Sequence, residues 1–270
     1  MSRTDRSFDG SIPELYDTYL VPLIFEAYAD DMASRVAALQ PDAVLETATG
    51  TGAVTRALAP LLKEGVRYVA TDINQPMLER AARMQSNAKG IEWRQADAMS
   101  LPFEDRSFAA VCCQFGAMFF PDRIAGYAET RRVLRPGGQF VFSVWDRIEE
   151  NEFADLVTQA AALSFPDDPP RFLARTPHGY HHAERITLDV RAAGFKDVGL
   201  FTIAERSRAP SARHVAIAYV QGTPLRNEIE ARDASRLEDV TETAAGMIAE
   251  RFGAGPVEGK IQGHVVVAQA

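Results

Sequence analysis

Val-Leu-Glu-Thr-Ala-Thr-Gly-Thr-Gly, residues 44–52, is the most informative segment of the chain. With Ala43 it begins as a short apolar run, which is typical of a strand buried in a parallel sheet. Gly50 and Gly52 let the backbone pass close to a bound ligand, and a helix is expected directly afterwards. Glu46 stands at the carboxyl end of the strand, the edge at which open α/β sheets bind ligands. An acid at this point favours a nucleotide-like ligand with amine or hydroxyl groups and argues against a bare phosphate.

The pattern of a strand followed by an acid repeats along the chain. A second strand is expected over residues 67–71 and ends at Asp72, twenty positions beyond Gly52. An acid at the tip of the second strand can accept hydrogen bonds from both hydroxyls of a ribose. Further strands are expected over residues 91–94, 108–114 and 139–145. Asp97 follows the first of these, so three acids stand past three successive strands at one edge of one sheet.

Four motifs in this region resemble the class I S-adenosylmethionine-dependent methyltransferases, close to the group that includes the ubiquinone and menaquinone biosynthesis C-methyltransferases. They are residues 44–52, Ala70-Thr71-Asp72-Ile73-Asn74-Gln75-Pro76-Met77-Leu78, Ala96-Asp97-Ala98 with Leu101-Pro102-Phe103, and Arg131-Arg132-Val133-Leu134-Arg135-Pro136-Gly137-Gly138. Together they span roughly residues 40–147, about 40% of the chain. Their joint order and spacing are far more specific than any one motif.

The resemblance implies S-adenosylmethionine as cofactor, S-adenosylhomocysteine as product and a small molecule as methyl acceptor. In that family Glu46 and the glycine loop would hold the methionine end, Asp72 the ribose and Asp97 the adenine amino group. The residues expected to bind the cofactor are Glu46, Thr47, Ala48, Thr49, Gly50, Gly52, Asp72, Ile73, Met77, Ala96, Asp97, Ala98 and Gln114.

Ala48 departs from the family pattern, which usually has glycine at this position. Alanine resists positive φ. Either the turn stays in allowed backbone space at Ala48, or it carries modest strain there.

The expected fold is α/β: a Rossmann-like seven-stranded mixed sheet with the last strand antiparallel and helices on both faces, plus an N-terminal helical cap and a helical insertion. Helices are expected over residues 13–19 and 23–39, with Pro22 near the start of the second. A helix over 124–134 is expected to stop at Pro136-Gly137-Gly138. Five segments are expected within one compact domain: the cap 1–40, the S-adenosylmethionine-binding core 41–147, a lid loop and the end of the sheet 148–206, the helical insertion 207–259 and the final strand 260–270.

The residues for the methyl acceptor are expected in two places. Phe115, Met118 and Phe119 follow the fourth strand at the ligand edge, where they either line a pocket or pack in the core. Tyr16 and Tyr19 of the cap belong to the same predicted pocket, since their rings can stabilise a sulfonium charge and their hydroxyls can orient an acceptor. The candidates for catalysis are Tyr16, Tyr19, His178, His181 and His182. A base is required only if the acceptor must lose a proton.

Composition restricts the other properties. The net charge of -8 and pI near 5.2 make a nucleic-acid partner unexpected. Cys112 and Cys113 lie inside the predicted fourth strand and are interpreted as inert core residues, and no metal is expected. The start of the chain lacks a signal-like apolar run, and no stretch is long enough to span a bilayer, so a cytoplasmic protein without membrane insertion is expected. The oligomeric state is left open.

Two other kinds of protein share parts of this pattern. A nicotinamide dehydrogenase would need a third glycine at position 55. The chain has Thr55 there, so it lacks the usual dinucleotide fingerprint. A non-catalytic protein that binds S-adenosylmethionine or S-adenosylhomocysteine on the same fold would keep Glu46, Asp72 and Asp97, and it stays as the alternative.

Overall fold

The computed structural model describes residues 5, 8, 10–86 and 90–270, so most of residues 1–9 of the predicted cap lie outside it. The chain forms two compact units. The sheet unit consists of Glu26–Val144, His181–Ile203 and Gly263–Ala270. The helical unit consists of Met1–Phe25, Trp145–Tyr180 and Ala204–Gln262. The predicted division into five segments stays a prediction.

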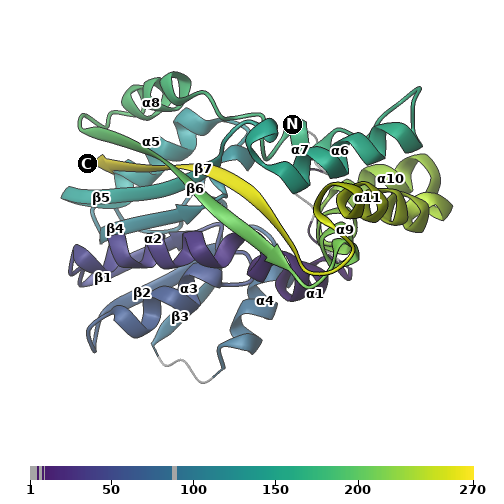
Figure 1. Ribbon diagram of the computed structural model, residues 1–270. Helices are drawn as coiled ribbons and strands as arrows, with labels where there is room; N and C mark the ends of the chain where they lie inside the picture. The colour runs from purple at the N-terminus through teal and green to yellow at the C-terminus, as the bar shows by residue number, and fades with distance from the viewer. Residues whose placement is uncertain (1–4, 6–7, 9, 87–89) are drawn as a thin grey trace. The chain divides into compact units, whose positions relative to one another are not determined.

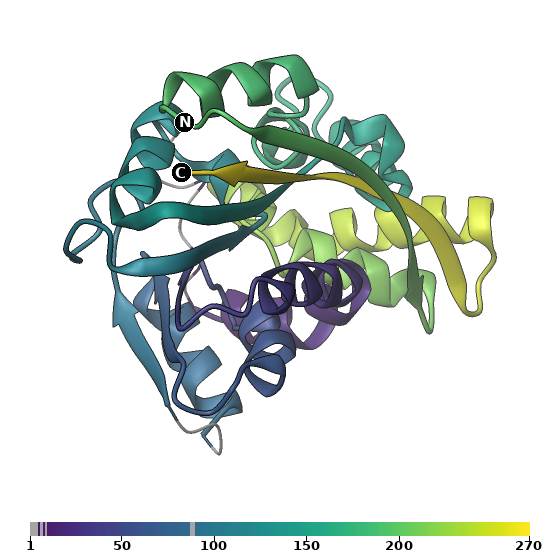
Figure 2. The ribbon, with the colours of Figure 1, turned by 90° about the vertical axis from the view of Figure 1, so that its left-hand side faces the viewer.

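A seven-stranded sheet in the order β3-β2-β1-β4-β5-β7-β6 organises the fold, as expected (Figure 1). Its strands are β1 Ala43–Thr47, β2 Arg67–Asp72, β3 Ile91–Gln95, β4 Phe108–Gln114, β5 Leu134–Trp145, β6 Val198–Ala209 and β7 Val257–Gln269. Strands β1 to β5 pair in parallel. The last strand, β7, leads to the C-terminus and runs antiparallel to β5 (Figure 2). Ala270, directly after the end of β7, bonds to Gly138 near the start of β5.

The central strands bury both faces because helices cover both sides. The helices of this unit are α2 Glu26–Ala38, α3 Ala53–Leu58, η3 Ala59–Leu61, α4 Gln75–Met84, η4 Ala117–Phe119, α5 Arg123–Val133 and α8 Ala183–Ala192. One core cluster joins α2 and α3 to Val44 and Val141. Phe140 and Phe142 flank Val141 and point to the other face, where they contact Tyr127 of α5.

Strand β5 begins earlier than the sequence predicts. The prediction that Pro136-Gly137-Gly138 separates helix from strand was wrong, because these residues lie within β5. Between Phe108 and Ala110 the pairing of β4 with β5 shifts its register, and the extra residues of β5 form a bulge. Gly137 has φ +80°, a conformation that glycine adopts at little cost.

The first helices also differ from the prediction. After the short α1 (Ile12–Leu15), residues Tyr16–Phe25 form a π-helix, η2, and α2 follows directly. Pro22 lies inside η2 rather than near the start of a helix, which corrects the prediction. Proline lacks a backbone donor and clashes with the preceding turn of an α-helix, so the wider π turn accommodates it better.

The helical unit packs around α6, α9 and α11. The helices of this unit are α1, η2, η5 Ile148–Glu150, α6 Glu152–Ser164, α7 Phe172–Arg175, α9 Ala212–Val220, α10 Leu225–Asp233, η6 Ala234–Arg236 and α11 Leu237–Phe252. Helices α9 to α11 lie between β6 and β7 in the chain, where the insertion was predicted. The segment 148–206 was predicted to contain a lid loop, but residues 164–182 within it include α7 and bury Phe172, His178 and Tyr180. It is therefore a packed segment, since apolar side chains anchor it.

Within the described part of the chain, no helix combines the length and the apolar character needed to cross a bilayer.

Arg132 of α5 fixes the connection between Asp97 and β4. Its guanidinium donates to the carbonyls of Leu101 and Phe103 at 3.0 and 2.8 Å and pairs with Glu129 and Asp105 at 2.7 Å each. We expect Arg132→Ala to lower the free energy of unfolding by about 2 kcal/mol, because several charge-assisted bonds to the loop are lost together. Denaturant unfolding measures this change. Arg132→Lys is the control: it keeps the charge without the planar fork, and full recovery of stability in this variant would contradict the explanation.

Candidate functional site

The glycine loop after β1 adopts the left-handed backbone that its glycines permit. Gly50 has φ +57° and Gly52 has φ +84°, and Gly52 begins α3 as its N-cap. A Cβ at Gly52 would lie 2.4 Å from Nε2 of Gln85 and 3.2 Å from Cβ of Ala81. Position 52 therefore favours glycine for its left-handed backbone, and a side chain there would also crowd Ala81 of α4. Met77, another predicted cofactor residue, is buried beside the loop near Gly50.

Asp72 connects the end of β2 to this loop. One carboxylate oxygen accepts the backbone N–H of Gly50 at 2.8 Å, and the other accepts the backbone N–H of Asn74 at 2.8 Å. Burial raises the pKa of Asp72, while the bonds from Asn74 and Gly50 oppose that rise. The oxygen that faces Asn74 also accepts the side-chain amide of Asn74 at 3.3 Å. The oxygen that faces Gly50 has a second lone pair, so the carboxylate can still accept a hydrogen bond from a ligand.

Glu46 is more deeply buried, with 2% of its surface exposed. Its Oε2 accepts the hydroxyl of Thr55 at 2.7 Å and the hydroxyl of Tyr68 at 2.5 Å. Burial raises the pKa of Glu46, and the hydroxyls of Thr49, Tyr68 and Thr55 oppose the rise because they bond to the charged form. A buried acid with few counter-charges suits a cationic ligand group such as an amine.

The third acid, Asp97, lies at the same sheet edge. It is half-buried and accepts the backbone N–H of Met99 at 2.9 Å. The N–H of Ala96 donates to the carbonyl of Asp72 at 3.0 Å, which holds the ends of β2 and β3 together. Glu46, Asp72 and Asp97 thus gather at the carboxyl ends of neighbouring parallel strands, as expected.

The remaining predicted cofactor residues lie along this edge. Thr47 ends β1 and Gln114 ends β4. Ile73 is 42% exposed, and its carbonyl accepts a bond from Gln95. Thr49 is buried and Ala98 is half-buried. The roles of these residues in binding stay predictions.

Ala48 has φ +52°, so the turn takes the strained one of the two conformations considered above. A Cβ at Gly116, the residue before η4, would lie 2.4 Å from the Cβ of Ala48 and 2.8 Å from Sγ of Cys113. The absence of a side chain at Gly116 therefore makes room for the methyl group of Ala48. The size of the side chain that position 48 can hold therefore depends on the size of the side chain at position 116.

The apolar segment after β4 is packed more closely than an open pocket wall. Phe115 has φ +49° and is buried, with its ring edge-on to Tyr28 at 5.0 Å between centroids. Met118 is also buried, whereas Phe119 is half-buried. Backbone strain at Phe115 and Ala48 concentrates at this edge, as is common at binding sites. The role of these residues toward an acceptor stays a prediction.

The catalytic candidates belong to both units. In the helical unit, Tyr16 stacks on Phe25 at 5.2 Å and Tyr19 lies 4.7 Å from the ring of His214. His178 is buried in the same unit, with Nδ1 2.8 Å from the carbonyl of Asp146.

His181 and His182 belong to the sheet unit, with their rings 4.1 Å apart. His182 is the exposed N-cap residue of α8. The catalytic roles of all five candidates stay predictions.

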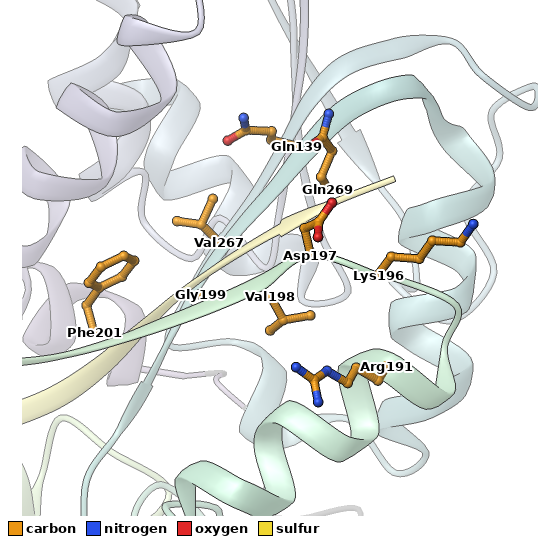
Figure 3. Close-up of a pocket in the computed structure, with 9 residues that line it drawn as sticks. All are labelled: Gln139, Arg191, Lys196, Asp197, Val198, Gly199, Phe201, Val267 and Gln269. Atoms are coloured by element: carbon orange, nitrogen blue, oxygen red, sulfur yellow. The ribbon is translucent and has the colours of Figure 1, made fainter.

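A hollow of about 480 Å³ opens at the opposite end of the sheet unit (Figure 3). Gln139 near the start of β5, Val198 at the start of β6 and Gln269 at the end of β7 contribute to its lining. Arg191, Lys196 and Asp197 on its rim are exposed. The hollow is distinct from the edge that carries Glu46.

Two negative findings concern other chemistry. Among the residues that the structure describes, no three His, Cys, Asp or Glu side chains gather as metal ligands would. Cys112 and Cys113 are fully buried, and burial raises the pKa of Cys113 to about 12. These thiols are therefore protonated and act as small apolar side chains.

Sequence reasoning missed Tyr68, Thr55 and Asn74, which hold the two central acids. For Tyr68 a signal existed, because a tyrosine within a buried strand needs a partner for its hydroxyl. Its partner followed only from the register, in which Val44 pairs with Tyr68 and brings β1 beside β2.

Comparison with known proteins agrees with this geometry. The family described as Methyltransferase domain matches residues 45–142. A demethylmenaquinone methyltransferase of Clavibacter sepedonicus is 32% identical over 67% of this chain and 79% of its own length. Another, of Deinococcus radiodurans, is 32% identical over 61% of this chain and 72% of its own length. The YcgJ protein of Bacillus subtilis has the same fold, with a TM-score of 0.57 at 17% identity over 90% of this chain and 98% of its own.

The coupling between Ala48 and Gly116 gives a test of the strained loop. We expect Gly116→Ala to cost about 1–3 kcal/mol of stability, because its methyl group meets the Cβ of Ala48. Ala48→Gly should stabilise the fold by about 1 kcal/mol through relief of positive φ. In the double variant the cost of Gly116→Ala should fall, and a double-mutant cycle by thermal unfolding measures the coupling. Gly246→Ala is the control, since that helical position has open space around it. Strict additivity at positions 48 and 116 would refute the contact.

The raised pKa of Glu46 gives a test of its burial. As pH rises above the usual value of 4.5, the unfolded chain ionises first, so this group lowers stability until the folded pKa is passed. We expect Glu46→Gln to remove that decline. The melting temperature of the variant, compared with that of the wild type, should therefore be more favourable at pH 7 than at pH 4. Glu129→Gln should behave oppositely, because Arg132 lowers the pKa of Glu129 and stabilises its charged form. Calorimetric unfolding from pH 4 to 7 measures both trends, and a loss of neutral-pH stability in Glu46→Gln would contradict the assignment.

Proposed function

The chain belongs to the class I S-adenosylmethionine-dependent methyltransferases, and from this premise we propose that it methylates a small, apolar or aromatic metabolite. The observation that carries the proposal is the arrangement of Glu46, Asp72 and Asp97 around a left-handed glycine loop. Within the sheet unit, these groups provide acceptors for an amine, a ribose and an adenine amino group in the order of the strands.

The residues at this edge fit the cofactor. Gly50 and Gly52 carry no side chains, so a ligand can approach the backbone of the loop closely. Glu46 and Asp72 are acids buried beside the loop, and a desolvated acid gains from donors or cations that a ligand supplies. We assign Glu46 to the methionine amine, Asp72 to the ribose hydroxyls and Asp97 to the adenine amino group.

When bound, S-adenosylmethionine supplies an electrophilic methyl group on a sulfonium. The protein's task is then positioning and exclusion of water, because an in-line displacement with a good leaving group needs little further assistance. The hydrogen bonds that Asp72 accepts from the backbone N–H groups of Gly50 and Asn74 hold the loop and the strand end in one geometry. The apolar residues Phe115 and Met118 exclude water near the end of β4.

The acceptor class is inferred from the apolar segment and from the relatives. Both relatives described above are named demethylmenaquinone methyltransferases, a name that points to a quinone-type acceptor. Phe115, Met118 and Phe119 provide apolar surface after β4, which suits an aromatic or quinone-like ring better than a charged molecule. We propose a phenolic or reduced quinone-like acceptor.

The test combines binding and turnover. Calorimetric titration with S-adenosylmethionine, S-adenosylhomocysteine and NAD should give micromolar binding for the first two and none for NAD. Formation of S-adenosylhomocysteine with a panel of phenols, hydroquinones and amines should then identify the acceptor class. Tight binding without turnover of any acceptor would favour the non-catalytic alternative, and NAD binding would contradict the site assignment.

Asp72 offers a sharper test of the ribose assignment. Asp72→Asn keeps a side-chain acceptor for Gly50 but loses the charge, and we expect it to weaken S-adenosylhomocysteine binding by about 1–3 kcal/mol. Asp105→Asn, on the exposed loop, is the matched control and should leave the affinity unchanged. Unchanged affinity in Asp72→Asn, measured by calorimetry, would remove Asp72 from the site.

A further inference from the structure

Tyr68 and Thr55 lie beneath the edge that binds the cofactor in the proposed function, and both act on one carboxylate oxygen. The Tyr68 hydroxyl donates to Oε2 of Glu46 at 2.5 Å, and the Thr55 hydroxyl donates to the same atom at 2.7 Å. Tyr68 and Thr55 are 3% and 0% exposed, so solvent does not compete for these bonds. Two donors on one oxygen fix the rotation of the carboxylate and bias its interactions with a ligand toward the other oxygen, Oε1.

We propose that Tyr68, assisted by Thr55, is a positioning residue that holds Glu46 oriented and ionised to receive the amino group of the ligand's amino-acid end. This inference rests on the proposed function, because it assumes that Glu46 meets an ammonium group. Tyr68 does not touch the ligand in this arrangement and acts only through Glu46.

The surroundings of Glu46 explain why such support is needed. Burial favours the protonated acid, which would no longer attract an ammonium group. The titratable groups that act on Glu46 come from three elements: Tyr68 of β2, Arg56 of α3, and Cys112 and Cys113 of β4.

Burial raises the pKa values of Tyr68, Cys112 and Cys113, so all three are neutral where Glu46 titrates. Arg56 contributes a weaker electrostatic attraction than the hydroxyl bonds. The hydroxyls of Thr49, Thr55 and Tyr68 are therefore the main groups that keep Glu46 charged. Thr49 lies 3.4 Å from Thr55 through their hydroxyl oxygens, which extends the network into the loop.

The test compares two ligands that differ in the amino-acid end. S-adenosylhomocysteine carries it, whereas methylthioadenosine lacks it and keeps the adenosine and sulfur. We expect Tyr68→Phe to weaken S-adenosylhomocysteine binding about tenfold at pH 7, in line with the loss of one hydrogen bond to a charged group. Methylthioadenosine affinity should stay within about twofold. Calorimetric titration from pH 5 to 7 should also show the half-maximal pH of S-adenosylhomocysteine binding moving upward, since Glu46 protonates more readily.

Four further variants separate positioning from folding. Tyr28→Phe removes another buried tyrosine hydroxyl, which donates to the carbonyl of Ile203 at 2.9 Å, and should leave both affinities unchanged. Thr55→Val removes the second donor and serves in place of Tyr68→Phe should that variant not fold, while Thr55→Ser should restore binding. In a Glu46→Gln background, Tyr68→Phe should add less than a twofold change.

The outcomes distinguish the two proposals. Equal weakening of both ligands by Tyr68→Phe, or a full tenfold effect that persists in Glu46→Gln, would overturn the positioning role and leave the proposed function intact. Unchanged S-adenosylhomocysteine binding in Tyr68→Phe would do the same. A wild-type protein that binds neither ligand would overturn the proposed function itself, and the role of Tyr68 with it.

Discussion

The hydrogen bond from the Gly50 N–H to the Asp72 carboxylate is the interaction on which the candidate site depends. It joins the loop after β1 to the end of β2, two segments that the chain separates by a whole helix. The loop has left-handed backbone at Ala48, Gly50 and Gly52, so it needs an outside partner to hold one conformation. Asp72 provides that partner, but its own burial is unfavourable. The carboxylate of Asp72 therefore both holds the loop in place and offers an acceptor to a ligand.

A second layer of polar residues gives the site its order. Asn74 holds Asp72, and the hydroxyls of Tyr68 and Thr55 hold Glu46. In a buried setting such networks stabilise the structure only when each member has its partners, and they orient the acids for a ligand. The strained alanine and the small Gly116 beside it show that the loop is fitted to its neighbours as well as to a ligand.

Most of the sheet could be predicted from the sequence because strand signals and acids recur in a fixed order. The limits of β1 to β4 were close to those observed, and the final strand was placed near β7 Val257–Gln269. The errors fell where tertiary packing overrides local preference. Pro136-Gly137-Gly138 reads as a turn but forms a bulge in β5, and Pro22 reads as a helix start but lies inside a π-helix. In both cases neighbouring elements supply contacts that the local pattern does not encode.

The fold class, the order of the acids and the family follow from residue types at fixed spacing, so the chain alone reveals them. Packing in three dimensions sets which groups hold those acids. Tyr68 and Glu46 lie twenty-two residues apart, and only the pairing of β1 with β2 brings the hydroxyl to Oε2. It also decided that Ala48 takes positive φ, because the space beside it depends on Gly116 after another strand. The spacing of residues along the chain shows which residue types follow each strand. It does not show which of them meet, because the distances between strands depend on register and packing.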